Sequence, residues 1–555
     1  MALTLWALLT QRAFGRAMSM PDLIRQFDAD MTSLETFYPV DWSGAGCGRY
    51  SAFVHEELQR LNKIDRTHLD TDGQIDWDLL SAYLQSRQDA IALTEAQNKE
   101  MQGLVPFQDE AVGLEEARVA THPKSPEESA KVLQSLVDST ARVQATFSQA
   151  MDSGKGTPSA ALAYRASKRI DRISGVLSGW YREFDGFVPS FAWWCKKPFE
   201  DLQKALAAYS KSLRERGAGF TEGKDAPLIG DPIGREAFVR QMNTELLGLT
   251  PEQMVDRAER DAVWCHDELK RASAELGFGD DWKKALQKVK LDHCSPDDQV
   301  ATICRIENEV IDFVTKRKLV TVEPLFRETW SWTMTSTQDE KVYPYPVYGG
   351  YKVMVPYASV DMDQKTKEQV FSGNGVHFLH NVIPHELIPG HHLQGLAAAK
   401  YASYRNRFST PFLIEGWAFY WELRLWDLGW SKSPEDRMAM LFWRLHRCAR
   451  VILTTKFHLG QTTPDEMVKY LTDEVGHEPE MAKAEVRRYL AGDYPPLYQC
   501  AYQVGAFALK DLHDEIVVKG HMSEQLFHDT VLKQGAIPVS LIARKLRSML
   551  ISHGS

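Results

Sequence analysis

The residues best suited to chemistry lie in the stretch that begins at His385, HELIPGHH. A histidine followed by a glutamate opens the metal-binding helix of many zinc hydrolases, in which a second histidine follows four residues after the first. Here that position is Pro389, and the next histidines are His391 and His392. The stretch is therefore either a metal site of altered geometry or a pair of buried histidines at a helix break.

The Pro-Gly pair inside this stretch predicts which histidine binds a metal. Pro389 lacks a backbone N–H and disfavours helical geometry at Ile388, while Gly390 tolerates unusual backbone angles. Such a pair can create a local bulge in a helix. A two-residue insertion returns His391 to the usual ligand position, whereas a regular helix favours His392. We expect His391 to be the ligand.

A third ligand is predicted in the apolar stretch that begins at Phe412, FLIEGWAFYWELRLW. A carboxylate among aromatic side chains is costly unless it is paired, protonated or bound to a metal. One class of zinc peptidase takes a glutamate ligand from a second helix at about the separation of Glu415 from His385. We expect Glu415 to bind the metal, and Glu422 to lie beside the ligands; the alternative is that Glu415 is a satisfied core carboxylate.

These residues together predict one Zn²⁺ per chain, bound by His385, His391 and Glu415, with a fourth position left for water. Glu386, next to the first ligand, is expected to act as general base toward that water. The predicted function is the hydrolysis of peptide or other amide bonds.

Hydrolysis also needs a donor to the oxyanion, and the substrate needs groups that hold it. Tyr498 and Tyr502 in LYQCAYQVG are candidate donors, and His458 in KFHLG is another. Arg488 is expected to pair with a substrate carboxylate, and Tyr498 is placed with it as a substrate-binding residue. For each of these residues a purely structural role is the alternative.

Helix-start signals indicate that these residues are positioned mainly by helices. At five places a hydroxyl residue is followed by proline and then by Asp or Glu, and in three of them Glu or Gln follows at the capping-box position. The hydroxyl residues are Ser125, Thr250, Ser295, Ser433 and Thr463. The predicted fold class is mainly α.

One stretch, residues 341–357, is rich in Val and Tyr and carries a Gly349-Gly350 pair between two β-like runs. This pattern predicts a small hairpin beside the metal site, with its prolines at an edge. Residues 217–234, rich in Gly and Asp, are the best linker candidate. They separate an N-terminal helical region, 1–230, from a helical catalytic region with the metal site, 231–555, and we expect the two regions to form one continuous fold.

Composition excludes several classes of partner. The chain has 555 residues, of which 44% are hydrophobic and 25% charged, and its net charge is −10. This charge argues against nucleic acid or an anionic membrane as the main partner. Seven scattered cysteines, without CxxC pairs, suggest reduced thiols. The N-terminal MALTLWALLTQRAF has no basic residue before its apolar stretch, so a signal peptide is less favoured than a buried first helix. We expect a cytoplasmic protein.

The motifs also resemble a known family. HELIPGHHLQ followed by IEGWAFYWE is similar to the DUF885 family of zincin-like, HExxPGH-containing proteins, and blocks that begin at Pro232, Arg444 and Val486 extend the similarity. The resemblance implies a large helical fold like that of glutamate-ligand zinc peptidases. It also favours His391 as the ligand, because the histidine after Pro-Gly is the regular one, and Tyr502 as the family's tyrosine.

The chain departs from the family pattern at two places. Thr454-Thr455-Lys456 replaces a common Asp-Thr-Gly, and Pro496-Leu497-Tyr498 replaces a Pro-Gly-Gln, so its substrate is expected to differ. Two alternatives to a peptidase stay open. One is an enzyme for a small-molecule amide or ester in a specialised pathway, and the other is a binding protein without turnover. The sequence does not predict the oligomeric state.

Overall fold

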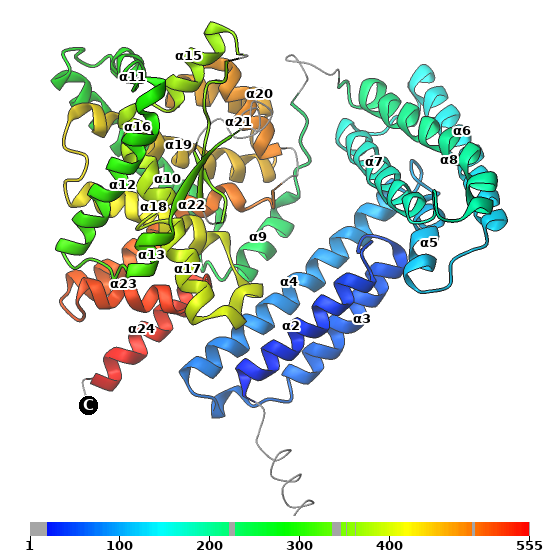
Figure 1. Ribbon diagram of the computed structural model, residues 1–555, viewed down its shortest axis with the longest axis horizontal. Helices are drawn as coiled ribbons and strands as arrows, with labels where there is room; N and C mark the ends of the chain where they lie inside the picture. The colour runs from blue at the N-terminus through cyan, green and yellow to red at the C-terminus, as the bar shows by residue number, and fades with distance from the viewer. Residues whose placement is uncertain are drawn as a thin grey trace, which may run out of the picture. The chain divides into compact units, whose positions relative to one another are not determined.

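Helices dominate the computed structural model of the chain, which describes residues 19–220, 228–335, 346–350, 352–360, 362–490 and 494–553. Within these residues the sheet structure is limited to three short strands. The prediction of a mainly α fold is therefore confirmed (Figure 1). The N-terminal apolar stretch, and residues 341–345 of the predicted hairpin, lie outside the described residues.

The chain divides into two compact units, Met1–Asp231 and Pro232–Ser555, and the division falls within the Gly- and Asp-rich stretch. The first unit is helical. Its main helices are α2 (Met20–Phe37), α3 (Gly44–Leu61), α4 (Thr71–Met101), α5 (Gln108–Val119), α6 (Pro126–Ser153), α7 (Ala160–Arg182) and α8 (Pro189–Ser212). Helices α2 and α3 lie along α4, and α6 and α7 lie along α8 (Figure 1).

The second unit holds all the predicted site residues. Its N-terminal helices are α9 (Gly234–Thr244), α10 (Pro251–Glu275), α11 (Trp282–Lys290), α12 (Gln299–Lys316) and α13 (Pro324–Thr329). Those that follow the sheet are α15 (Gln364–Gly373), α16 (Val376–Glu386), α17 (His391–Tyr401), α18 (Pro411–Asp427), α19 (Pro434–His458), α20 (Pro464–Tyr470), α21 (Pro479–Leu490), α22 (Tyr498–His513), α23 (Glu524–Lys533) and α24 (Val539–His553). Helix α18 packs along α22, and α10 packs along α19.

The predicted helix starts agree with the structure, with one exception. Capping boxes form at four of the five hydroxyl residues, Ser125, Thr250, Ser433 and Thr463. At Ser433 an aspartate, Asp436, completes the box, whereas the other three boxes use Glu or Gln. Ser295 instead precedes a short 3₁₀ turn and makes no side-chain cap hydrogen bond.

The small sheet has the strand order β1-β3-β2, with β1 (Ser331–Met334) parallel and β2 (Val347–Tyr348) antiparallel to β3 (Lys352–Val355). Strands β2 and β3 form a hairpin around the Gly-Gly pair, where Gly350 has a φ of 91° that favours glycine. The β1 strand was not predicted, because SWTM is short and its side chains are mostly exposed. Strand β2, which directly follows Pro346, lies at the edge of the sheet, where the sequence placed it.

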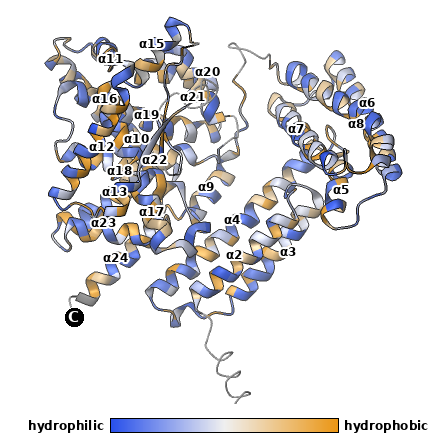
Figure 2. Cartoon of the chain, viewed as in Figure 1, coloured by the Kyte–Doolittle hydropathy of each residue, from blue (hydrophilic) through white to orange (hydrophobic). Residues whose placement is uncertain are grey.

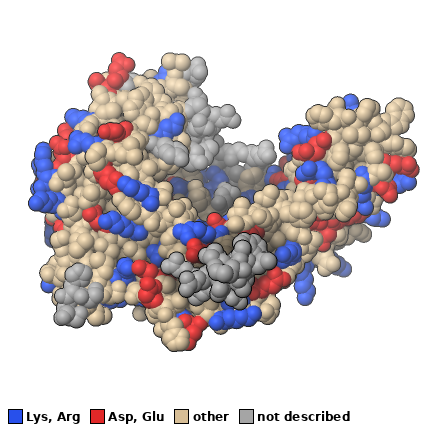
Figure 3. All heavy atoms as spheres, turned by 60° about the horizontal axis from the view of Figure 1, so that its bottom comes forward, with Lys and Arg blue, Asp and Glu red and all other residues tan. Residues whose placement is uncertain are grey.

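Hydropathy and charge follow the helices. Most helices carry both hydrophobic and hydrophilic residues (Figure 2), as expected for helices with one buried face. Helix α18 is buried almost all round, including both of its glutamates. On the face shown in Figure 3, acidic and basic side chains are interspersed. No helix among the described residues has the length and apolar character needed to cross a membrane.

Candidate metal centre

We had expected the HELIPGHH stretch to form a bulge within one helix. In the structure it instead separates two helices. Helix α16 ends at Glu386, and α17 begins at His391. Between them the chain turns tightly, and the Gly390 N–H donates a 3.0 Å hydrogen bond to the carbonyl oxygen of Pro384. A Cβ at Gly390 would lie 1.8 Å from the carbonyl oxygen of His385, so only glycine fits. The break brings the side chains of His385 and His391 close together.

Two side chains from other helices hold this turn. Glu307 of α12 accepts a 3.0 Å hydrogen bond from the Ile388 N–H. The Trp417 indole of α18 donates a 2.8 Å hydrogen bond to the carbonyl oxygen of Pro389. Complete burial raises the pKa of Glu307 well above its ordinary value, and the hydrogen bond from Ile388 opposes this shift. The turn is therefore fixed from two sides by buried polar contacts.

The three predicted ligands converge. Glu415 Oε2 lies 3.2 Å from His391 Nε2 and 3.7 Å from His385 Nε2. One ligand atom from each residue lies within 4.8 Å of the other two. Tetrahedral zinc, with bonds of about 2.0–2.2 Å, holds its ligand atoms roughly 3.3 Å apart. The three side chains are buried and fit such an ion with only small movements.

The neighbouring histidine is directed elsewhere. His392 Nδ1 lies 3.1 Å from the Tyr348 hydroxyl, and its Nε2 lies 3.2 Å from the carbonyl oxygen of Phe326. Both ring nitrogens are thus engaged outside the ligand group. The structure brings His391, and not His392, to the other two ligands.

Close packing of two helices places Glu415. Its neighbour Gly416 lies against Gly505 of α22, and a Cβ on either glycine would come within 3.0 Å of backbone atoms of the other helix. This approach lets the Tyr498 hydroxyl of α22 donate a 2.7 Å hydrogen bond to Glu415 Oε1. Burial would raise the pKa of Glu415, but the imidazoles of His391 and His385 hold it well below its ordinary value. The carboxylate of Glu415 is therefore ionised at neutral pH.

Glu422 holds the other face of the first histidine. Its Oε1 lies 2.7 Å from His385 Nδ1 and accepts a 2.7 Å hydrogen bond from Arg447. Its Oε2 accepts a 2.7 Å hydrogen bond from Asn381. Burial would lower the pKa of His385, but bonds to Glu415 and Glu422 raise it to about 9. A carboxylate on the far nitrogen is the usual partner of a metal-binding histidine, because it fixes the ring and its tautomer.

Glu386 is placed to act as a base. Its Oε1 lies 4.0 Å from His385 Nε2, and its Oε2 accepts a 2.8 Å hydrogen bond from the Tyr348 N–H of β2. Burial raises the pKa of Glu386, although His385 and His391 oppose the shift. A raised carboxyl pKa suits a general base that works near neutral pH.

A cavity of about 350 Å³ opens over this group. Its wall includes seven of the eight predicted site residues, which are His385, Glu386, His391, Glu415, Arg488, Tyr498 and Tyr502. Burial raises the pKa of Tyr502 to about 12, so its hydroxyl stays protonated and able to donate. The hydroxyl of Tyr498, which was predicted to bind substrate, donates a hydrogen bond to Glu415.

The eighth residue, His458, does not join the site. It lies in the last turn of α19, its ring is 5.9 Å from that of Phe238, and it is not part of the cavity wall. Burial lowers the pKa of His458 to about 4, and neither ring nitrogen has a hydrogen-bond partner among the described residues. His458 is therefore a neutral core residue and no longer a candidate for the oxyanion donor.

Four cavity residues of α19 were missed in the sequence. Trp443, His446, Arg447 and Arg450 all line the cavity. Their spacing of three, one and three residues puts them on one face of a helix. Polar residues that recur in this way within an otherwise apolar helix are the signal that would have identified them.

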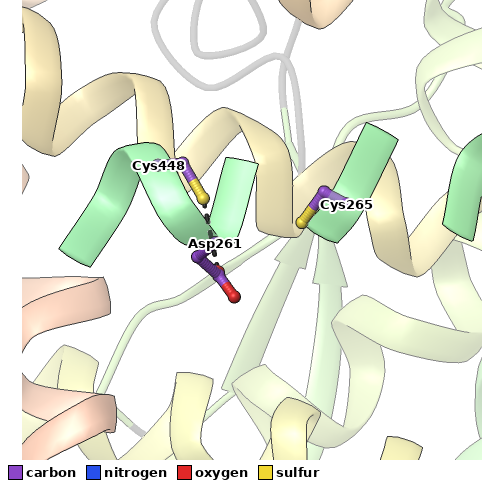
Figure 4. A group of neighbouring side chains, drawn as sticks. All are labelled: Asp261, Cys265 and Cys448. Carbon is purple, nitrogen blue, oxygen red and sulfur yellow. Dashed lines mark hydrogen bonds between the residues drawn. The ribbon is translucent and has the colours of Figure 1, made fainter. Parts of the chain in front are cut away.

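A second group of potential metal ligands has a different character. Asp261 and Cys265 of α10 lie near Cys448 of α19, with a Cys448–Asp261 hydrogen bond of 3.3 Å (Figure 4). Arg444 donates to both oxygens of Asp261, at 3.0 and 2.5 Å, and Gln503 donates to the same carboxylate at 3.0 Å. A cation would have to displace the guanidinium, so this group is a hydrogen-bonded part of the core.

Residues 39–546 match the DUF885 family, described as bacterial proteins of unknown function, and the chain belongs to this family. No curated protein matches the chain. Solved structures with the same fold include a "putative lipoprotein of unknown function" from Shewanella oneidensis, with 18% identity and a TM-score of 0.71 over 96% of this chain and 100% of that one.

A second solved structure, a "putative lipoprotein" from Colwellia psychrerythraea, has 15% identity and a TM-score of 0.61 over 97% of this chain and 100% of that one. Lipoproteins are exported and held at a membrane by a lipid. The descriptions of both structures therefore contradict the cytoplasmic location that we expected. That expectation rested on the scattered cysteines and on the N-terminal stretch, which lacks a basic residue before its apolar part. Scattered cysteines do not distinguish a cytoplasmic protein from an exported one.

Proposed function

We propose that this protein is a zinc-dependent hydrolase of peptide or other amide bonds. The observation that carries the proposal is the convergence of His385, His391 and Glu415 on one point, with Glu386 beside them and facing the same cavity. Two imidazoles and one carboxylate form a ligand set of catalytic zinc sites, which leave one position open.

Each protein group then has a defined role. Zinc, when bound, supplies a Lewis acid that activates water and polarises a carbonyl. Glu386 accepts the proton of the attacking water and passes it to the leaving amine. Tyr502 donates a hydrogen bond to the oxyanion. Glu422 and Tyr498 fix the orientation of two ligands from behind.

The size of the cavity favours a short substrate. A volume of about 350 Å³ lies near the lower end of the range of small-molecule sites. Strand β2 does not offer a free edge at this point, because the outward Tyr348 N–H is already bonded to Glu386. A short peptide therefore fits better than a long chain added as a strand. A small-molecule amide fits the same volume, and it is the second candidate substrate.

Metal analysis of the purified protein, combined with a screen of dipeptides, tripeptides and simple aryl amides, tests the proposal. We expect about one zinc per chain, and hydrolysis that is lost with a chelator and restored by zinc. Hydrolysis of aryl amides alone would favour the small-molecule substrate. Absence of stoichiometric metal would overturn the proposal, and zinc without any turnover would favour a binding protein.

We also propose that the protein works outside the cytoplasm, which the lipoprotein descriptions of the two solved structures support. Fractionation of its native cells, with an antibody to the protein, should find it in the envelope or the medium. Recovery with cytoplasmic enzymes would contradict this location.

A further inference from the structure

The cavity wall opposite the ligands carries more positive than negative charge. Arg447, Arg450 and Arg488 all line the cavity. Arg447 is matched by Glu422, at 2.7 Å. The other two guanidinium groups share one carboxylate, that of Glu485, at 3.3 Å from Arg450 and 3.8 Å from Arg488. One positive charge of this pair is therefore unmatched by the contacts among the described residues.

Each of Arg450 and Arg488 lies over a tyrosine ring, and Arg450 is also buried. Arg450 is 6% exposed, and its guanidinium carbon lies 4.7 Å from the centre of the Tyr502 ring. Its Nε has no hydrogen-bond partner among the described residues. Arg488 lies over the Tyr494 ring at 5.1 Å and is more exposed than Arg450. A buried cation with unused donors is costly unless a ligand supplies an anion.

Tyr502 connects this pair to the ligands. Its ring lies 6.4 Å from the ring of His385, nearly parallel at 10°, and 4.7 Å from the Arg450 guanidinium carbon. The guanidinium and the imidazole are thus separated by at most the sum of these two distances. An extended peptide advances about 3.3–3.6 Å per residue. At most about three residues therefore span the gap between a carbonyl at the ligands and an anion at the arginines.

We propose that Arg450 and Arg488 form a subsite for the free carboxylate of the substrate. This inference rests on the proposed function and deepens it. The substrates are short peptides, or N-acyl amino acids, that are cleaved within about three residues of a free C-terminal carboxylate. A planar, forked guanidinium is the side chain that recognises carboxylate best. The tyrosine rings of this wall then contact the side chain of the C-terminal residue.

Binding of a matched pair of probes tests the subsite without requiring turnover. The probes are N-acetyl-L-phenylalanine and its primary amide, which differ only in the charged group. Calorimetry should show the acid binding the full-length protein about 10-fold more tightly than the amide, or better. Arg488→Gln should reduce this preference to less than about threefold and leave the binding of the amide unchanged.

Two further variants complete the test. Arg450→Lys keeps the charge that pairs with Glu485 but lacks the forked donors, so it should weaken the acid selectively if the protein is folded. Arg260→Gln, which removes an exposed arginine that is 72% accessible and pairs with Asp256, is the matched control and should change nothing. Acid and amide that bind equally, or acid binding that survives Arg488→Gln, would overturn the subsite. The second outcome would show that the carboxylate is held elsewhere, for example by the metal.

Hydrolysis separates this inference from the proposed function. If free-acid and C-terminally amidated peptides are cleaved with equal kcat/KM, the subsite is wrong and the hydrolase stands. If acid binding depends on Arg488 but no peptide is cleaved, the subsite stands and the hydrolase is wrong. When both are right, Arg488→Gln should raise KM for free-acid peptides at least about 10-fold while kcat changes little, because the lost contact is remote from the reacting atoms.

Discussion

Replacing Glu422 with Gln should weaken zinc binding without removing any ligand. The Glu422 residue is 2% exposed. Its carboxylate lies 2.7 Å from His385 Nδ1 and accepts hydrogen bonds from Arg447 and Asn381, each at 2.7 Å. The amide keeps the shape but loses the charge that fixes the tautomer and ring of His385. Loss of such a partner typically lowers metal affinity about 10- to 100-fold, which corresponds to roughly 1.4–2.7 kcal/mol.

The same change should also destabilise the fold, because it leaves the buried Arg447 guanidinium without its counter-charge. Breaking a buried ion pair typically costs about 3–5 kcal/mol. Glu524→Gln is the matched control. Glu524 of α23 accepts two hydrogen bonds, at 2.6 and 3.0 Å, from Arg424, which lies in α18 as Glu422 does. Glu524 does not contact any of the three predicted ligands. It should lower the stability and leave the zinc affinity unchanged.

Competition with a fluorescent zinc chelator gives the affinities, and urea unfolding of the metal-free proteins gives the stabilities. The expected result is a loss of zinc affinity that is specific to Glu422→Gln. If this variant bound zinc as tightly as the parent, the contact with His385 Nδ1 would not orient the ligand, and the interpretation of Glu422 would be refuted.

Three further predictions concern individual residues of the second unit. His391→Ala should abolish stoichiometric zinc and His392→Ala should retain most of it, as measured by elemental analysis; the reverse would exchange their roles. Tyr502→Phe should keep the zinc and lower kcat about 10²- to 10³-fold in a peptide assay, whereas unchanged turnover would exclude it as the oxyanion donor. The pKa of His458 is lowered from 6.5 to about 4, so its contribution to stability is complete above pH 6.5 and is lost as the pH falls toward 4. His458→Leu should therefore remove about 2.4 kcal/mol of the acid-induced loss of stability between pH 7 and pH 4.5, measured by urea unfolding, with hydrolysis retained; an unchanged pH dependence would contradict the burial argument.

The helical fold and the core of the site could be predicted because their signals are local. Hydroxyl-Pro helix starts such as Thr250 and Ser433 fix where helices begin without reference to the rest of the fold. The HELIPGHH stretch predicted that His385 and His391 come together. Glu415 could be added to them because an unpaired carboxylate in an apolar helix is costly, and the structure brings the three side chains to one point.

The partners of these residues could not be predicted, because they depend on which helices meet. Glu307 holds the turn at Ile388 from a position 81 residues away in the chain. Its own sequence, in an ordinary amphipathic helix, carries no sign of complete burial. Tyr498 could be placed near the site, but its bond to Glu415 follows from the Gly416–Gly505 contact, which only the folded chain creates.

The wrong expectations also have physical explanations. His458 lies on nearly the same face of α19 as Arg447, but about 16 Å further along the helix, where it packs against Phe238 beyond the cavity. The helix at HELIPGHH was expected to continue through a bulge. Instead it ends at Glu386, since Gly390 passes directly against the His385 carbonyl and leaves no room for a continuous helix.

The most direct test of the central claim is the zinc content and hydrolytic activity of Glu386→Gln, measured on the same preparation. The Glu386 carboxylate lies beside the ligands but not among the three that converge, and glutamine cannot accept the proton. A hydrolytic zinc centre with Glu386 as base predicts about one zinc per chain and almost no hydrolysis of any substrate that the parent cleaves. Full activity in this variant, or loss of its zinc, would contradict that account.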